Sequence, residues 1–271
     1  MLPEIQEEQE LFEKLQHKNE MRKKKRHTIE ELKKSGSLSL LQWPSNVAIL
    51  LAKKLLEQGK NVADMPAAFT NAHSILLINQ TKLSNALMCQ PQQRNTKGRI
   101  FGGFLMRRAF ELAFTTAYKF LGQQPLFKEV DRVEFKLPVE VGDLLQFSSC
   151  ILYTSNNVDG VDQDYFELCQ LSSPGLGFSR QQTFTGGPRV HVEVVASVTR
   201  PEEGTSKVSN TFHFTFEAVD ASKPVCKVVP SSMEQAHSVV CQVDINFQQQ
   251  EDDHAAVKVI NTPEQQDELK K

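Results

Sequence analysis

The segment from Gln93 to Gly103 holds the residue types best suited to bind and polarise a carbonyl group. It reads Gln-Arg-Asn-Thr-Lys-Gly-Arg-Ile-Phe-Gly-Gly and directly precedes a long apolar stretch. The first turn of a helix carries N–H groups without partners and the positive end of the helix dipole. Adjacent glycines let a ligand oxygen reach those amides unhindered. Glycines before a helix also occur as plain turn chemistry, so the pattern alone leaves both interpretations open.

Polar side chains in the same segment extend the candidate site. The amide of Asn95 suits the orientation of an attacking water or of a carbonyl, and the alternative for it is a turn or cap residue. Arg94, Lys97 and Arg99 suit phosphate groups as charge-assisted donors. The alternative for each basic residue is that it only makes the loop soluble.

A single long helix is predicted from Gly103 to Leu121, where apolar residues dominate and no proline intervenes. One polar stripe at four-residue spacing interrupts the apolar surface: Arg107, Glu111, Thr115 and Lys119. This pattern predicts a helix enclosed on most sides and open along the stripe. Glu111 is the only carboxylate in the helix and therefore a candidate catalytic group, with an ion pair to Arg107 as the alternative.

Period-two patterning predicts the strands that enclose this helix. The segments are 74–89, 130–137, 144–154, 190–198 and 209–218. The Pro-and-Gly segment 138–143 predicts a turn between antiparallel neighbours. One long helix after the first strand and four further antiparallel strands predict an α+β fold, with the helix held in the concavity of the sheet.

The rest of the chain divides around this domain. A charged helix is expected over 1–34, and a second helical segment after Pro44 is expected to end at Gly59. The predicted boundaries are a helical extension and linker over 1–75, a folded domain over 76–235 containing a disordered insertion over 155–189, and a disordered tail over 236–271.

Composition excludes several classes of function. A formal net charge of -2 argues against bulk nucleic-acid binding. The apolar stretches are too short for a membrane-spanning helix. The 5 cysteines are widely spaced without a Cys-x-x-Cys pair, so neither a disulfide framework nor a metal site is indicated. His191 and His213 lie within alternating strands and are interpreted as ordinary packed or surface histidines.

The combined pattern resembles a known family. Arg94-Asn95-x-x-Gly98-Arg99-Ile100-Phe101-Gly102-Gly103-Phe104-Leu105-Met106, followed by Val133-x-Phe135-x-x-Pro138-Val139-x-Val141-Gly142-Asp143, resembles the acyl-coenzyme A thioesterases of the hotdog fold. The similarity is greatest to the second domain of the mitochondrial acyl-coenzyme A thioesterase nine type, apparently without the first hotdog domain.

The resemblance implies a single hotdog fold with an N-terminal helical extension. It also implies hydrolysis of acyl-coenzyme A to a free fatty acid and coenzyme A, with no cofactor, since coenzyme A is part of the substrate. Sites of this family form where hotdog units meet, so a homo-oligomer or pairing with another hotdog unit is expected. A mitochondrial location is implied, but the acidic N-terminus shows no transit peptide, and a cytoplasmic location is the alternative.

The resemblance also assigns roles within the site. Asn95 stands where related thioesterases place a contributing Asn, the N–H of Gly102 or Gly103 would polarise the carbonyl, and the three basic residues would meet coenzyme A phosphates. Gln93 stands where a partner unit often carries a catalytic Asp. This departure motivates an alternative function: a catalytically impaired, truncated module that binds acyl-coenzyme A or pairs with a full-length thioesterase.

Overall fold

The computed structural model describes residues 46–64, 75–155, 168, 188–220, 222–223 and 225–244. Its elements, in chain order, are α2 (Asn46–Asp64), β1 (Ile75–Leu77), η1 (Ile78–Thr81), β2 (Leu83–Met88), η2 (Pro91–Gln93), α3 (Gly102–Leu121), β3 (Pro125–Phe135), β4 (Leu144–Ser155), β5 (Arg189–Arg200), η3 (Pro201–Glu203), β6 (Thr205–Ala218) and β7 (Lys227–Val229). A helix over 233–244 follows. The predicted helix over 1–34 and nearly all of the predicted insertion lie outside the described residues.

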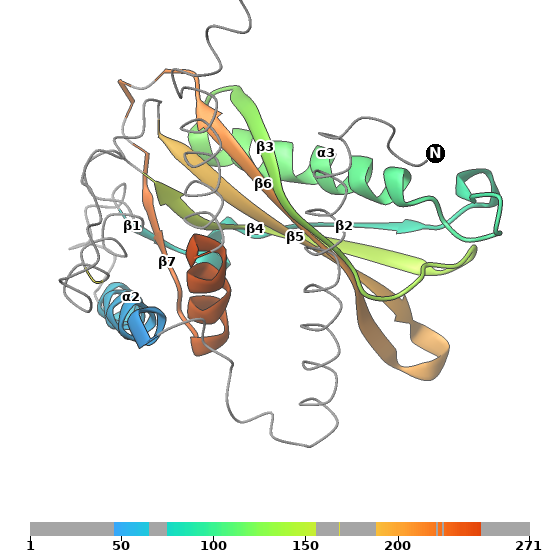
Figure 1. The fold of residues 1–271 in the computed structure, drawn as a ribbon, viewed down its shortest axis with the longest axis horizontal. Coiled ribbons are helices and arrows are strands. Elements are labelled where there is room, and N and C mark those ends of the chain that lie inside the picture. Colours follow the sequence, from blue (N-terminus) through green and yellow to red (C-terminus); the bar gives the residue numbers. More distant parts are fainter. Residues whose placement is uncertain are drawn as a thin grey trace, which may run out of the picture. The chain divides into compact units, whose positions relative to one another are not determined.

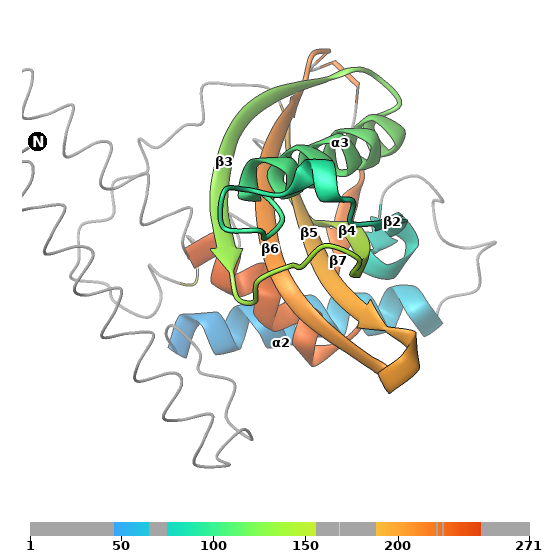
Figure 2. The same ribbon diagram turned by 90° about the vertical axis from the view of Figure 1, so that its right-hand side faces the viewer.

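Five antiparallel strands form one sheet in the order β2-β4-β5-β6-β3. The long helix α3 packs across this sheet, and the strands curve around it (Figures 1 and 2). The predicted α+β architecture is confirmed. The predicted first strand is instead two short strands, β1 and β2, separated by the 3-10 turn η1.

The prediction that segment 138–143 joins antiparallel neighbours is wrong. β3 pairs with β6 at one edge of the sheet, whereas β4 lies between β2 and β5. The segment therefore runs from the edge strand β3 toward the opposite edge of the sheet, and its backbone bonds to Cys89 before the 93–103 loop and to Ile100 within it. Val139 accepts from Ile100 N at 3.0 Å, and Cys89 exchanges bonds with Asp143 (3.0 Å) and Gly142 (2.8 Å). This crossover helps to hold the residues that precede α3.

The sheet is covered on both faces. Phe212, Phe214 and Phe216 are fully buried on the face of α3, and Phe110 of α3 lies 5.8 and 6.0 Å from the last two rings. The alternate residues of β6 are buried as well. The opposite side carries β7, which pairs in parallel with β1, and α2 packs against both (Figure 1). Burial therefore does not alternate along this part of β6, because neither face of the strand meets water.

The predicted start of the disordered tail at residue 236 is wrong. Residues 233–244 form a helix, and Ala236, Val239, Val240 and Val243 are buried. Their spacing of three and four residues places them on one face of the helix. Residues 245–271 lie outside the described residues, so the tail prediction for them stands as a prediction.

The strands on either side of the predicted insertion pair along their whole length. Ser155, at the end of β4, is opposite Arg189, at the start of β5, and the ladder continues to Leu144 opposite Thr199. Whatever residues 156–187 do, they leave the pairing of β4 with β5 intact.

Gly59 does not end α2, which runs to Asp64. It is buried in the helix, and a Cβ at this position would lie 2.0 Å from the backbone oxygen of Pro230. The glycine thus permits close contact between α2 and the segment after β7.

Gly59→Ala is expected to destabilise the protein, although alanine is the better helix former by about 1 kcal/mol. The added methyl collides with backbone, which cannot rotate away as a side chain does, and overpacking of this kind costs about 1–3 kcal/mol. Thermal or urea unfolding of Gly59→Ala beside Lys60→Ala, a change at an exposed neighbour, measures the difference. A variant more stable than the wild type would show that the two segments do not touch here.

Candidate active site

The loop before α3 is a tight turn built around Asn95. Its side-chain Oδ1 accepts hydrogen bonds from the N–H groups of Lys97 (2.9 Å) and Arg99 (3.2 Å), and its own N–H donates to Arg99 O at 2.6 Å. Gly98 follows with φ +82°, a conformation that favours glycine. Among the described residues the Asn95 Nδ2 group has no hydrogen-bond partner. Asn95 is therefore a turn residue with one donor group left over.

The start of α3 presents two unused amides. Phe101 N donates to Gln93 O at 2.9 Å, and Phe101 O accepts from Phe104 N and Leu105 N, which fixes the first turn. Within the described part of the chain, the N–H groups of Gly102 and Gly103 have no acceptor. Gly103 is exposed and Gly102 is half-buried, so both positions are open on one side.

Two aromatic rings border the glycine pair. A Cβ on Gly102 would lie 3.3 Å from the Phe135 ring, and a Cβ on Gly103 would lie 2.4 Å from the Phe101 ring. Both phenylalanines are more than half exposed, at 54% for Phe135 and 58% for Phe101. The corner is therefore flanked by exposed apolar rings and is not filled by them. Only glycine fits at 103 without displacing a ring.

The three basic residues differ in their engagement. Arg99 Nε lies 3.2 Å from Glu140 Oε1 in an exposed ion pair. Arg94 and Lys97 are exposed, and neither has an acidic partner among the described residues. These two cations are thus available to an anion beside the Asn95 loop, whereas Arg99 would exchange a partner that it already has.

Gln93 has a local structural role. Its side-chain Oε1 accepts a hydrogen bond from Gln90 N at 3.0 Å, which closes the turn of η2. An amide, like a carboxylate, accepts such a bond, so the departure from an acidic residue leaves the turn intact. It does remove a group able to act as a base at this position.

Glu111 sits on the predicted polar stripe and forms the predicted ion pair. Its carboxylate accepts from Arg107 Nε at 3.0 Å and from Arg108 Nη1 at 2.8 Å. Partial burial raises the pKa of Glu111, but the hydrogen bonds and charges of the two arginines outweigh it and hold the pKa below its usual value. Nine residues of helix place Glu111 about 13 Å beyond Gly102. Within one chain it does not reach a carbonyl bound at the helix start.

If the chain hydrolyses the thioesters that its resemblance implies, Glu111→Gln should leave turnover close to wild type. It should change the free energy of unfolding by less than about 1 kcal/mol, because an exposed ion pair contributes little. Its lowered pKa means that this stabilisation is present above the usual pKa of a glutamate and is lost as the pH falls through the lowered value. Steady-state kinetics and unfolding at neutral and acidic pH measure both. A loss of turnover of about 100-fold would make Glu111 a catalytic group serving a partner's site.

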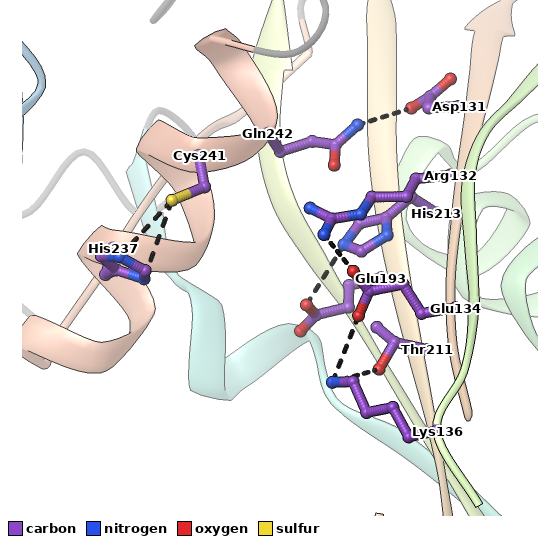
Figure 3. Close-up of polar contacts among 10 residues, drawn as sticks. All are labelled: Asp131, Arg132, Glu134, Lys136, Glu193, Thr211, His213, His237, Cys241 and Gln242. Atoms are coloured by element: carbon purple, nitrogen blue, oxygen red, sulfur yellow. Dashed lines mark hydrogen bonds and ion pairs between the residues drawn. The ribbon is translucent and has the colours of Figure 1, made fainter. Parts of the chain in front are cut away.

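The face of the sheet opposite α3 carries clusters of polar groups that the sequence did not predict (Figure 3). His213 Nε2 lies 3.3 Å from Glu193 Oε1. Glu134 pairs with both Arg132 and Lys136, and Lys136 Nζ also donates to Thr211 Oγ1 at 3.4 Å. These residues come from three strands and meet only because β3, β6 and β5 are adjacent.

A second polar group on this face surrounds His191. Thr215 Oγ1 lies 2.9 Å from His191 Nδ1 and from the Asp131 carboxylate, to which Gln242 Nε2 also donates at 3.3 Å. The ring of Tyr153 stacks on His191 at 4.1 Å. His191 and His213 are 5% and 7% exposed, so of the two predicted alternatives, packed or surface histidines, both are packed. In the sequence, both histidines appear only as polar residues within the alternating patterns of β5 and β6, and nothing marks them as members of a cluster.

Comparison with known proteins finds relatives of one kind, although no family model matches the chain. The chain is 40% identical over 249 residues to acyl-coenzyme A thioesterase 2, chloroplastic, of Humulus lupulus, covering 89% of this chain and 48% of the relative. It is 42% identical over 246 residues to acyl-coenzyme A thioesterase 4, mitochondrial, of the same organism, covering 89% and 40%. Human acyl-coenzyme A thioesterase 9, mitochondrial, is 38% identical over 139 residues, covering 51% and 25%.

Solved structures share the fold. The acyl-CoA hydrolase of Staphylococcus aureus in complex with butyryl coenzyme A and coenzyme A superposes with a TM-score of 0.52 at 19% identity, covering 69% of this chain and 99% of that one. The acyl-CoA hydrolase of Bacillus cereus gives 0.52 at 17% identity, covering 69% and 96%. The chain thus has the hotdog fold. The sequence relatives are named acyl-coenzyme A thioesterases, and the chain spans about half or less of their length.

Proposed function

We propose that this chain hydrolyses acyl-coenzyme A thioesters to a free fatty acid and coenzyme A, with the thioester carbonyl bound at the start of α3. The observation that carries the proposal is the pair of N–H groups at Gly102 and Gly103, which lack acceptors among the described residues at the positive end of a 20-residue helix. Such amides stabilise the negative oxygen that develops when water attacks the thioester. The thioesterase relatives support the same chemistry.

Asn95 supplies a third donor in this proposal, beside the two backbone amides. Because both backbone amides of its own turn already bind Oδ1, the side chain offers its Nδ2 hydrogens and no free acceptor. It therefore suits the carbonyl of the substrate better than the attacking water. Arg94 and Lys97, with Arg99 after release from Glu140, lie on the same loop and would bind the phosphates of coenzyme A.

A second hotdog unit completes the site in this proposal, because Gln93 supplies no carboxylate and Glu111 lies too far along its helix. β3 is an edge strand of 11 residues, and it carries the exposed apolar residues Leu126, Phe127, Val130 and Phe135. A long apolar edge of this kind pairs readily with another strand. We propose that the chain corresponds to the second hotdog unit of its longer relatives and works as a homo-oligomer or beside another hotdog unit. Native mass spectrometry tests this, since a strictly monomeric active protein contradicts it.

The relatives also motivate a location. The sequence relatives named above are chloroplastic or mitochondrial proteins. We propose an organelle, and specifically the mitochondrion, for this protein. Cell fractionation followed by immunoblotting tests this, and enrichment in the cytosolic fraction would favour the alternative. None of the described helices is long and apolar enough to cross a membrane.

The experiment for the function is a thiol-release assay with acyl-coenzyme A substrates of several chain lengths. Burial raises the pKa of Cys89 to about 11 and that of Cys150 to about 12, so these thiols stay protonated at neutral pH and react slowly with the reagent. Release of coenzyme A supports the hydrolase. Saturable binding without release would favour the alternative, an impaired module that binds acyl-coenzyme A, which Gln93 motivates.

A further inference from the structure

Asn210 is a fully buried amide for which the described part of the chain offers no partner. It lies in β6 with an exposed fraction of 0%, and among the described residues neither its Oδ1 nor its Nδ2 has a hydrogen bond. Buried side-chain amides are nearly always hydrogen-bonded, because the interior does not replace the bonds lost to water. Asparagine is also disfavoured in strands. An asparagine at this position, against both tendencies, suggests a partner that arrives from outside the protein.

The strand register places Asn210 on the face of α3. It is opposite Ala196 of β5 and Phe135 of β3, and opposed residues of antiparallel strands point to the same face. Phe135 contacts Phe212, whose neighbour Phe214 packs on α3. The side chains beside Asn210 are therefore alanine and phenylalanine, which offer no donor or acceptor.

Asn210 lies level with the start of α3. The far end of the helix is fixed to the end of β6, because Gln123 exchanges hydrogen bonds with the backbone of Asp220 at 2.9 and 3.3 Å. From Asp220 back to Asn210 the strand covers roughly 33 Å, and from Gln123 back to Gly102 the chain covers roughly 31 Å. The ring of Phe135, which is opposite Asn210, also borders Gly102. The unpartnered amide is thus beneath the proposed carbonyl site.

We propose that Asn210 binds the secondary amide of the substrate's pantetheine arm that is nearest to the thioester. This role rests on the proposed function. A thioester carbonyl offers only an acceptor, whereas an amide offers one donor and one acceptor, which match Oδ1 and Nδ2 of Asn210. Two methylene groups separate that amide from the sulfur. When the thioester carbonyl is bound at Gly102 and Gly103, the amide of the arm therefore lies only a few bonds away from it. Phe135, exposed at the edge of the sheet, is the side chain that moves to admit it.

The test compares two small thioesters of the same acyl group. An N-acetylcysteamine thioester retains the amide of the arm, whereas an S-propyl thioester lacks it. Asn210→Ala should lower kcat/KM for the first by roughly 10- to 100-fold relative to wild type, and for the second by no more than about threefold, because only the first loses a buried hydrogen bond. Asn85→Ala is the matched control: Asn85 belongs to the same row across the sheet but is exposed in the edge strand β2.

Equal losses on the two thioesters would overturn the role of Asn210 while leaving the proposed function in place. No hydrolysis of any thioester by the wild type would overturn the proposed function and this role with it. Circular dichroism and thermal unfolding check the variant, which should unfold no earlier than wild type because it buries fewer unbonded atoms. If Asn210→Ala does not fold, Asn210→Val, with a side chain suited to a strand, enters the same comparison.

Discussion

Gly103→Val is expected to lower the turnover of acyl-coenzyme A by roughly 100- to 1000-fold, the scale observed when one donor to a developing oxyanion is lost. A Cβ at this position lies 2.4 Å from Cε1 of Phe101, so the new side chain and the displaced ring both crowd the two free amides. The backbone is helical here, and the helix itself should persist. Thiol release under saturating substrate, with circular dichroism as the folding check, measures the effect.

Phe101→Ala shows whether the valine side chain or the displaced Phe101 ring causes the loss of turnover. If the displaced ring blocks the site, adding Phe101→Ala to Gly103→Val should restore most of the turnover. If the valine itself covers the amides, the double variant should stay as slow as the single one. Phe101 is 58% exposed, so its removal leaves no buried cavity. Turnover of Gly103→Val equal to that of wild type would remove the start of α3 from the mechanism.

The helix and the strands were predictable because each depends on local pattern. The apolar stretch before Leu121 and the alternation around Phe212, Phe214 and Phe216 follow the periods of helix and strand directly, and both elements are present. The glycine pair is at the helix start, as the segment 93–103 predicted. Local propensity and burial agree in these elements, and no distant contact has to be known.

The predictions from sequence fail where contacts between residues far apart in the chain determine the structure. Segment 138–143 has the composition of a hairpin turn, but the pairing of β3 with β6 is set by residues some 80 positions away, which turn chemistry does not reveal. Gly59 has the signature of a helix end, yet its absent side chain serves contact with Pro230. The helix over 233–244 is polar enough to suggest a tail and is held by the buried face that it offers.

In the candidate site, too, the residues that are close together in sequence were predictable, and the distant one was not. The Asn95 turn and the glycine pair are contiguous in the chain, so one segment reveals them. Asn210 lies more than 100 residues away, and its role depends on the order of the strands and on its having no hydrogen-bond partner among the described residues. No sequence pattern distinguishes it from an exposed polar residue of an alternating strand.

Asn95→Ala is expected to lower turnover by roughly 10- to 1000-fold through loss of a polar group that stabilises the reacting carbonyl. The same change also removes Oδ1 from the N–H groups of Lys97 and Arg99, so it loosens the loop by about 1 kcal/mol, as the loss of a capping oxygen does. Turnover alone therefore does not separate a catalytic donor from a loop support.

Asn95→Asp makes that separation. Aspartate keeps an oxygen at Oδ1 for both amides of the turn but has no N–H to donate, and it places a negative charge near the developing oxyanion. If Nδ2 binds the carbonyl, Asn95→Asp should be as slow as Asn95→Ala while unfolding at the wild-type temperature. If Asn95 only supports the loop and lies too far from the carbonyl for the added charge to matter, the aspartate variant should recover wild-type turnover. Kinetics and thermal unfolding of both variants decide the matter, and the second outcome would leave the amides of Gly102 and Gly103 as the only donors to the oxyanion in the proposed site.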